Sequence, residues 1–99
     1  YKCYVFVDQS KLPAGVLRDD ILIAINALNV PCYSGSCSEV YKEKAFNNTD
    51  LQPKVALKQA KTLGETSLMF LVHPTITHNE ISNVCESLTQ ALDIINNKL

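Results

Sequence analysis

The sequence predicts a small two-layer α/β (α+β) domain, in which a mixed sheet of about three strands carries helices on its surface. Three observations support this fold class. The chain has 99 residues, enough for one hydrophobic core. Hydrophobic residues make up 46% of it and charged residues 19%, which is typical of a globular protein. Segments with strand-like composition alternate with segments of helical periodicity, and this order predicts helices layered on a sheet.

Three segments have the composition of strands, namely residues 1–7, 30–33 and 67–72. The first is rich in aromatic and β-branched residues, which favours a mostly buried strand. The third is followed by His73 and Pro74. Because proline restricts the residue before it to extended geometry, we expect the strand to end there.

Two helices are indicated by apolar residues at helical spacing. The first starts near Leu17, and Asn29 is its expected stop. The last helix follows Thr77, which with Glu80 forms the pattern of a capping box. Its apolar positions keep helical phase as far as Leu99, so we expect a helix of about five turns.

Two further helices are expected between the second and third strands. Ser38 is a suitable cap for a short helix that carries Tyr41. Asp50 is expected to cap the next helix, with Pro53 in its first turn and Gly64 as its stop.

Charge and hydropathy exclude two classes of partner. Nine basic residues against ten acidic ones give a net charge of −1, without a basic run. This balance is not that of a surface for nucleic acid or anionic lipid. The longest apolar run, residues 68–72, is far shorter than the ~20 residues of a membrane span. We therefore expect neither a nucleic-acid partner nor a membrane partner.

Four cysteines are present, and their settings suggest free thiols. Cys3 lies in an apolar strand and Cys85 on the apolar stripe of the last helix, so both are expected to be buried. Cys32 and Cys37 are too isolated from a second ligand pair to predict a metal site. A reduced, cytoplasmic protein is expected. Because a strand begins at Tyr1 without an initiator Met, we also expect the chain to be part of a longer protein.

A run of small residues follows the second strand: Ser34-Gly35-Ser36-Cys37-Ser38. Hydroxyl and backbone N–H groups at the end of a strand can bind an anion or a sugar. The run lacks the glycine pattern of a dinucleotide or phosphate loop, and a plain turn is the alternative interpretation.

The order and spacing of several segments resemble the C-terminal small domain of the DegT/DnrJ/EryC1/StrS family of sugar aminotransferases, a fold-type I small domain. The segments are Arg18-Asp19-Asp20-Ile21, then residues 30–41, then residues 71–81. The resemblance covers essentially the whole chain, so residues 1–99 are expected to form a single domain.

This resemblance implies an enzyme that uses pyridoxal phosphate to transfer an amino group, usually from glutamate, to a nucleotide-linked keto sugar. Such sugars serve surface polysaccharide or antibiotic biosynthesis. In the family, the cofactor lysine and most phosphate contacts belong to the N-terminal domain. The resemblance therefore implies no catalytic, cofactor-binding or metal residue in this chain, and an inactive isolated fragment. Its implied partners are its own N-terminal domain and a second copy in a homodimer.

The resemblance implies that this chain contributes substrate-binding residues to the active site. We expect these to be Tyr33, Ser34, Ser36 and Cys37. Many family members carry a His-Tyr pair and a longer insertion after the second strand, and this chain has a shorter segment there. The family's histidine therefore has no counterpart here. Two other functions remain open from the residues alone: a free-standing small-ligand-binding or regulatory α/β module, and a scaffold or dimerisation domain.

Overall fold

The computed structural model describes residues 1–97 of the chain. Its strands are β1 (Lys2–Phe6), β2 (Cys32–Tyr33) and β3 (Ser67–Leu71). Its helices are α1 (Arg18–Ala27), α2 (Lys58–Thr66) and α3 (His78–Asn96). Three short 3-10 helices complete the order: η1 (Gln9–Lys11), η2 (Val40–Lys42) and η3 (Lys44–Phe46).

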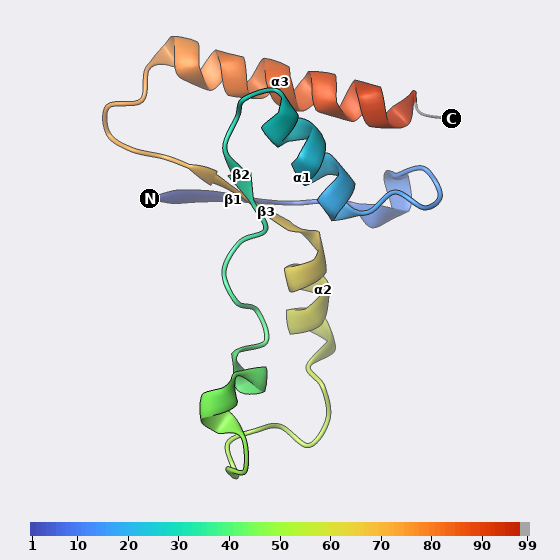
Figure 1. The fold of residues 1–99 in the computed structure, drawn as a ribbon, viewed down its shortest axis with the longest axis vertical. Helices are drawn as coiled ribbons and strands as arrows, with labels where there is room; N and C mark the ends of the chain where they lie inside the picture. The colour runs from blue at the N-terminus through green and yellow to red at the C-terminus, as the bar shows by residue number, and fades with distance from the viewer. Residues whose placement is uncertain (98–99) are drawn as a thin grey trace.

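The strands form one sheet in the order β1-β3-β2, and both pairings are antiparallel. In the register, Met69 of β3 lies opposite Tyr4 on one side and Tyr33 on the other. Helices α1 and α3 pack together, and α1 also contacts β2 and β3 (Figure 1). The predicted α/β fold class and its three strands are confirmed, but the sheet is antiparallel throughout and not mixed as expected.

The core lies between β3 and these two helices. Ile21 and Ile25 of α1 are one turn apart and buried, as are Ala91 and Ile95 of α3. Leu68 of β3 meets them from the sheet. A spacing of four residues places such side chains on one helix face, so the periodicity correctly identified the packed sides of both helices.

The ends of α1 and α3 follow local signals in the sequence. The carboxylate of Asp20 accepts a hydrogen bond from the backbone N–H of Leu17 at 2.8 Å, at the start of α1. Asn29, with φ of 65°, ends α1 in the left-handed conformation. Thr77 Oγ1 accepts the backbone N–H of Glu80 at 3.2 Å, at the start of α3. The expected helical position Leu99 lies outside the described residues.

The prediction for α2 was wrong at both ends. Asp50 caps nothing there: the helix begins at Lys58 and continues past Gly64 to Thr66. Gly64 is needed for a different reason, because a Cβ on it would lie 2.9 Å from the Cβ of Ser38. The Ser38 side chain, which is 26 positions away in the sequence, occupies the space that a larger residue would need, and this explains the glycine.

The short helix expected after Ser38 was also wrong in form. It is replaced by the two 3-10 turns η2 and η3. The N-cap of η2 is Glu39, and Ser38 instead lies against Gly64. With its side chain drawn toward α2, Ser38 does not serve as a cap.

The first strand and two cysteines are more exposed than expected. β1 lies at an edge of the sheet, and Tyr4 and Phe6 are exposed because no helix covers their face. Cys3 and Cys85 are exposed rather than buried, since both line an open groove. An apolar stripe predicts which face packs, but not how completely that face is covered.

The molecule is extended for its length. Its radius of gyration is 16.3 Å, whereas a compact domain of this size has about 13 Å. Figure 1 shows the reason: residues 38–66, which we call the arm, project away from the rest. Residues 1–33 and 67–97 are called the body, and residues 34–37 connect it to the arm. Within residues 1–97, no helix combines the length and hydropathy needed to cross a bilayer.

Candidate functional site

One face of the sheet is not covered by helices, and we call it the open face. It carries a row across all three strands, formed by Tyr4, Met69 and Tyr33, because directly paired residues project to the same side. Phe6 and Ser67 continue this face by the two-residue alternation of strands. Tyr33 is 48% exposed, while Met69 between the two tyrosines is buried. The face thus presents aromatic side chains to solvent.

Residues 34–37, which we call the site loop, are held by hydrogen bonds at the end of the open face. The hydroxyls of Tyr4 and Ser36 are hydrogen bonded at 2.7 Å. Ser67 donates its hydroxyl to the carbonyl oxygen of Ser34 at 2.8 Å. Gly35 has φ of +90°, and a Cβ there would lie 3.0 Å from the Ser67 hydroxyl oxygen. The loop therefore needs glycine at this position to sit so close to the sheet.

Arg18 joins this loop to the rest of the fold. Its Nη1 donates to the carbonyl oxygens of Ser67 at 2.7 Å, Gly64 at 3.0 Å and Ser34 at 3.4 Å. Its Nε pairs with Asp19 at 2.7 Å. From the sequence, Arg18 is expected only at the start of a helix, and this role is not predicted. A usable signal was present, because it is the sole arginine of the chain.

Asn26 holds the short strand β2 in place. Its side-chain amide donates to the carbonyl oxygen of Cys32 at 2.9 Å and accepts from the backbone N–H of Cys32 at 3.2 Å. This pair of bonds resembles the pairing between two strands, and it fixes the point from which the site loop departs. Burial raises the pKa of the Cys32 thiol, so this cysteine behaves as a core residue.

Cys37 ends the site loop as a neutral hydrogen-bond donor. Its Sγ lies 3.2 Å from Oε1 of Glu43. The hydrogen bond to this carboxylate raises the pKa of the Cys37 thiol above its ordinary value. A thiol is nucleophilic as the thiolate, so this arrangement favours binding over covalent chemistry at Cys37.

The structure thus brings three of the predicted substrate residues, Tyr33, Ser34 and Ser36, to the rim of the open face. Cys37 continues the same loop but bonds toward the arm. The four residues are exposed, and only Gly35 interrupts them in the sequence. Whether they bind substrate stays a prediction.

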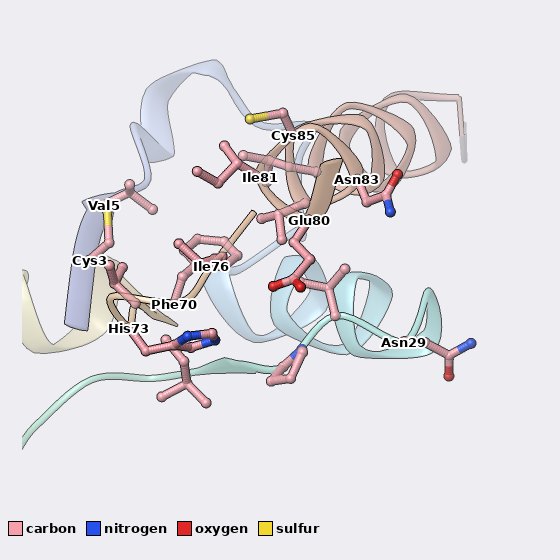
Figure 2. Close-up of a pocket in the computed structure, with 16 residues that line it drawn as sticks. Cys3, Val5, Asn29, Phe70, His73, Ile76, Glu80, Ile81, Asn83 and Cys85 are labelled. Atoms are coloured by element: carbon pink, nitrogen blue, oxygen red, sulfur yellow. The ribbon is translucent and has the colours of Figure 1, made fainter. Parts of the chain in front are cut away.

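A separate apolar groove lies on the other side of the sheet, between the strands and α3. Its volume is about 610 Å³. Figure 2 shows Cys3 and Val5 of β1 on one side and Ile81 and Cys85 of α3 on the other. It contains none of the predicted substrate residues. His73 borders it and is hydrogen bonded through Nδ1 to Thr75 Oγ1 at 2.8 Å.

The lysines and metal-ligating side chains decide whether residues 1–97 could hold a cofactor or a metal. Every lysine in residues 1–97 is exposed, and none lines the groove. Lys42, which pairs with Glu39 at 3.1 Å, has its pKa raised, the opposite of what an amine nucleophile requires. The residues present therefore do not fit a lysine site for pyridoxal phosphate. Among the same residues, no group of three or more side chains is placed to hold a metal ion.

Comparison with solved structures gives an informative similarity, whereas two other comparisons do not. No protein-family model matches the chain, and a search of curated proteins found no match either. Among solved structures, the chain is 54% identical to an aminotransferase from Psychrobacter cryohalolentis, with a TM-score of 0.90. The similarity covers 98% of this chain and 25% of that chain, so this chain spans about a quarter of the length of that enzyme. In sequence and in fold, the chain is thus similar to one quarter of an aminotransferase, which supports an aminotransferase domain in general.

Proposed function

We propose that residues 1–99 are the C-terminal small domain of a pyridoxal-phosphate-dependent sugar aminotransferase of the DegT type. The reaction transfers an amino group from glutamate to a keto group on a nucleotide-linked sugar, for surface polysaccharide or antibiotic sugar biosynthesis. The observation that carries the proposal is the 54% identity to an aminotransferase over 98% of the chain. The DegT-like segments around Arg18, at residues 30–41 and at residues 71–81 support the sugar class.

The site loop supplies the sugar-binding groups in this proposal. Tyr33 presents an aromatic face and a phenol, and Ser36 presents a hydroxyl, both at the rim of the open face. Ser34 contributes through the loop backbone, whose carbonyl oxygen Ser67 and Arg18 hold in place. Cys37 remains a neutral donor beside Glu43. An aromatic platform with several hydrogen-bonding groups suits a nucleotide-linked sugar, which is both polar and planar in part.

In this proposal the chain binds and orients the sugar, while residues outside it hold the cofactor. Pyridoxal phosphate supplies the electron sink of transamination when it is bound. The role of the site loop is to place the keto carbon within reach of that chemistry. Orientation of this kind requires a loop whose geometry exists before substrate arrives. The bonds from Arg18, Ser67 and Tyr4 provide such a geometry.

The remaining partners and the location follow from the same proposal. The domain belongs with the cofactor-binding N-terminal domain of its own chain, in an enzyme that forms a homodimer. All four cysteines are free in the structure. Free thiols suit a reducing compartment, which is consistent with a cytoplasmic enzyme.

The first experiment is the visible absorption spectrum of the full-length gene product, recorded before and after addition of glutamate. We expect the band of the enzyme-bound cofactor to be present and to bleach with glutamate. A colourless protein would overturn the proposal and favour a free-standing ligand-binding module.

Steady-state kinetics then test the site loop. We expect Tyr33→Phe and Ser36→Ala to raise KM for the nucleotide-linked sugar, while leaving KM for glutamate unchanged. Ser82→Ala, at an exposed serine of α3, serves as the matched control. Equal KM values in all three variants would remove the loop from the substrate site.

A further inference from the structure

The arm carries apolar side chains but has no core of its own. None of residues 38–66 is buried. Leu51 and Val55 are 71% and 73% exposed, and Val40, Leu57 and Leu63 are each about half exposed. Single exposed apolar residues are ordinary, but a segment of this length without one buried residue is not. The arm therefore has apolar surface that nothing in residues 1–97 covers.

Despite this, the arm has a defined internal geometry. The Tyr41 hydroxyl donates to Oε2 of Glu39 at 2.6 Å and accepts the backbone N–H of Leu57 at 3.0 Å. The Gln52 side chain donates to the carbonyl oxygen of Tyr41 at 2.8 Å. These bonds tie the two sides of the arm together around one tyrosine. An individual hydrogen bond contributes little net stability, so these bonds specify the shape of the arm more than they stabilise it.

The comparison structure indicates what surrounds the arm. The similarity extends over 98% of this chain at a TM-score of 0.90, and so includes the arm. This chain corresponds to only 25% of that protein. The projecting arm is thus shared with an enzyme that has three times as much additional polypeptide available to cover it.

The base of the arm is continuous with the candidate site. Gly64 of the arm accepts a hydrogen bond from Arg18, whose Nη1 also bonds Ser34 of the site loop. Ser38, the first residue of the arm, packs against Gly64. Any body that covers the arm would therefore lie next to the open face.

We propose that the apolar surface of the arm docks on the remainder of the same polypeptide, outside the 99 residues, and that this contact places the open face at the boundary between two domains. The proposal rests on the proposed function, because it requires an aminotransferase chain longer than this segment. The arm then forms a contact between the two domains, in which Leu51 and Val55 are the principal residues. Contacts of this kind between domains are partly apolar and bury surface that an isolated domain exposes.

Photo-crosslinking in the full-length protein tests the occupant. A benzophenone amino acid is introduced at Val55 and, as a control, at the exposed Gln90 of α3. The two copies are distinguished by mixing isotope-labelled and unlabelled protein before irradiation. We expect Val55 to crosslink within its own polypeptide, to residues outside the 99, in several-fold higher yield than Gln90. A yield equal to that of Gln90, or crosslinks only between copies, would overturn the proposal.

Limited proteolysis gives an independent measurement on the same full-length protein. Val55→Asp places a charge in the proposed contact, whereas Lys54→Asp changes the neighbouring residue, which is also exposed. Burying an unpaired charge is costly, so we expect cleavage within residues 38–57 to rise at least about tenfold in Val55→Asp and little in Lys54→Asp. Equal cleavage in both variants would count against docking.

The absorption spectrum with glutamate, recorded on the crosslinking samples, keeps the two proposals separate. A protein with the cofactor band but without the crosslink would leave the proposed function standing and overturn the docking of the arm. A colourless protein would lose the proposed function whatever the crosslinks show.

Discussion

The body and the arm both contain apolar residues, but the two regions are held together differently. Every buried residue that the structure describes lies in the body, and none lies in the arm. In the body, apolar side chains at helical spacing pack against a neighbouring element, and Ile25, for example, packs in the core. In the arm, Leu51 and Val55 are not covered by any part of residues 1–97, and local turns and side-chain hydrogen bonds set the conformation. Periodicity is therefore a reliable guide only where the packing partner belongs to the same segment of chain.

The largest expected effect tests this division directly. Ile25→Ala removes a fully buried side chain and should destabilise the domain by about 2–5 kcal/mol, because it leaves a cavity. Ile23→Ala, two residues away and 65% exposed, should change stability by at most about 0.5 kcal/mol. Urea unfolding followed by circular dichroism measures both. Similar losses in the two variants would contradict the core described for the body.

Arg18 tests the junction between the body and the arm. Arg18→Ala removes a charged donor from three carbonyl oxygens and should cost about 1.5–3 kcal/mol in the free energy of unfolding. It should also increase hydrogen exchange in the site loop. Asp19→Ala, which removes only the exposed partner of Arg18, should cost at most about 1 kcal/mol. If the alanine variants of both residues behave alike, the carbonyl bonds do not hold the junction.

Alanine substitutions at two glycines with positive φ distinguish the cost of backbone strain from the cost of contact with the sheet. Gly35→Ala and Gly15→Ala both force an L-residue into positive φ, which costs about 1–2 kcal/mol. Only at Gly35 does the new Cβ meet other atoms, within 3.0–3.2 Å of Ser67 and Tyr4. Gly35→Ala should therefore be the more destabilising and should alone raise KM for the nucleotide-linked sugar. Thermal unfolding and steady-state kinetics measure the two effects, and equal effects would show that the loop does not depend on close seating.

The smallest effect concerns thiol reactivity. The Glu43 carboxylate raises the pKa of Cys37, so less of this thiol is ionised at a given pH. Glu43→Ala should lower that pKa and accelerate alkylation of Cys37 by iodoacetamide at pH 8 several-fold. Cys32, whose pKa is raised by burial, should react slowly in both proteins. Peptide mass spectrometry resolves the sites; an unchanged rate at Cys37 would remove Glu43 as its controlling neighbour.

Much of the body could be predicted from the residues alone. The positions of α1 and α3, the stop at Asn29 and the cap at Thr77 are local features, set by side chains within four residues of each other. The three strands could be located for the same reason, from their composition. The site loop could be singled out as a run of small residues after the second strand, although its binding role is still a prediction.

Other features depended on atoms far apart in the chain, and only the tertiary structure decided them. The order β1-β3-β2 places β1 at an edge of the sheet, and within residues 1–97 no helix covers the face that carries Tyr4 and Phe6, so both are exposed in a strand expected to be mostly buried. The sequence predicts Gly64 as a helix stop, whereas the structure shows that glycine is needed there because Ser38 packs against it. The residue pairs that define the site are far apart in the chain, and Arg18 and Ser67, for example, are 49 positions apart. Local periodicity and capping act within a few residues, whereas strand order, close contacts between distant residues and long-range hydrogen bonds arise only when the chain is folded.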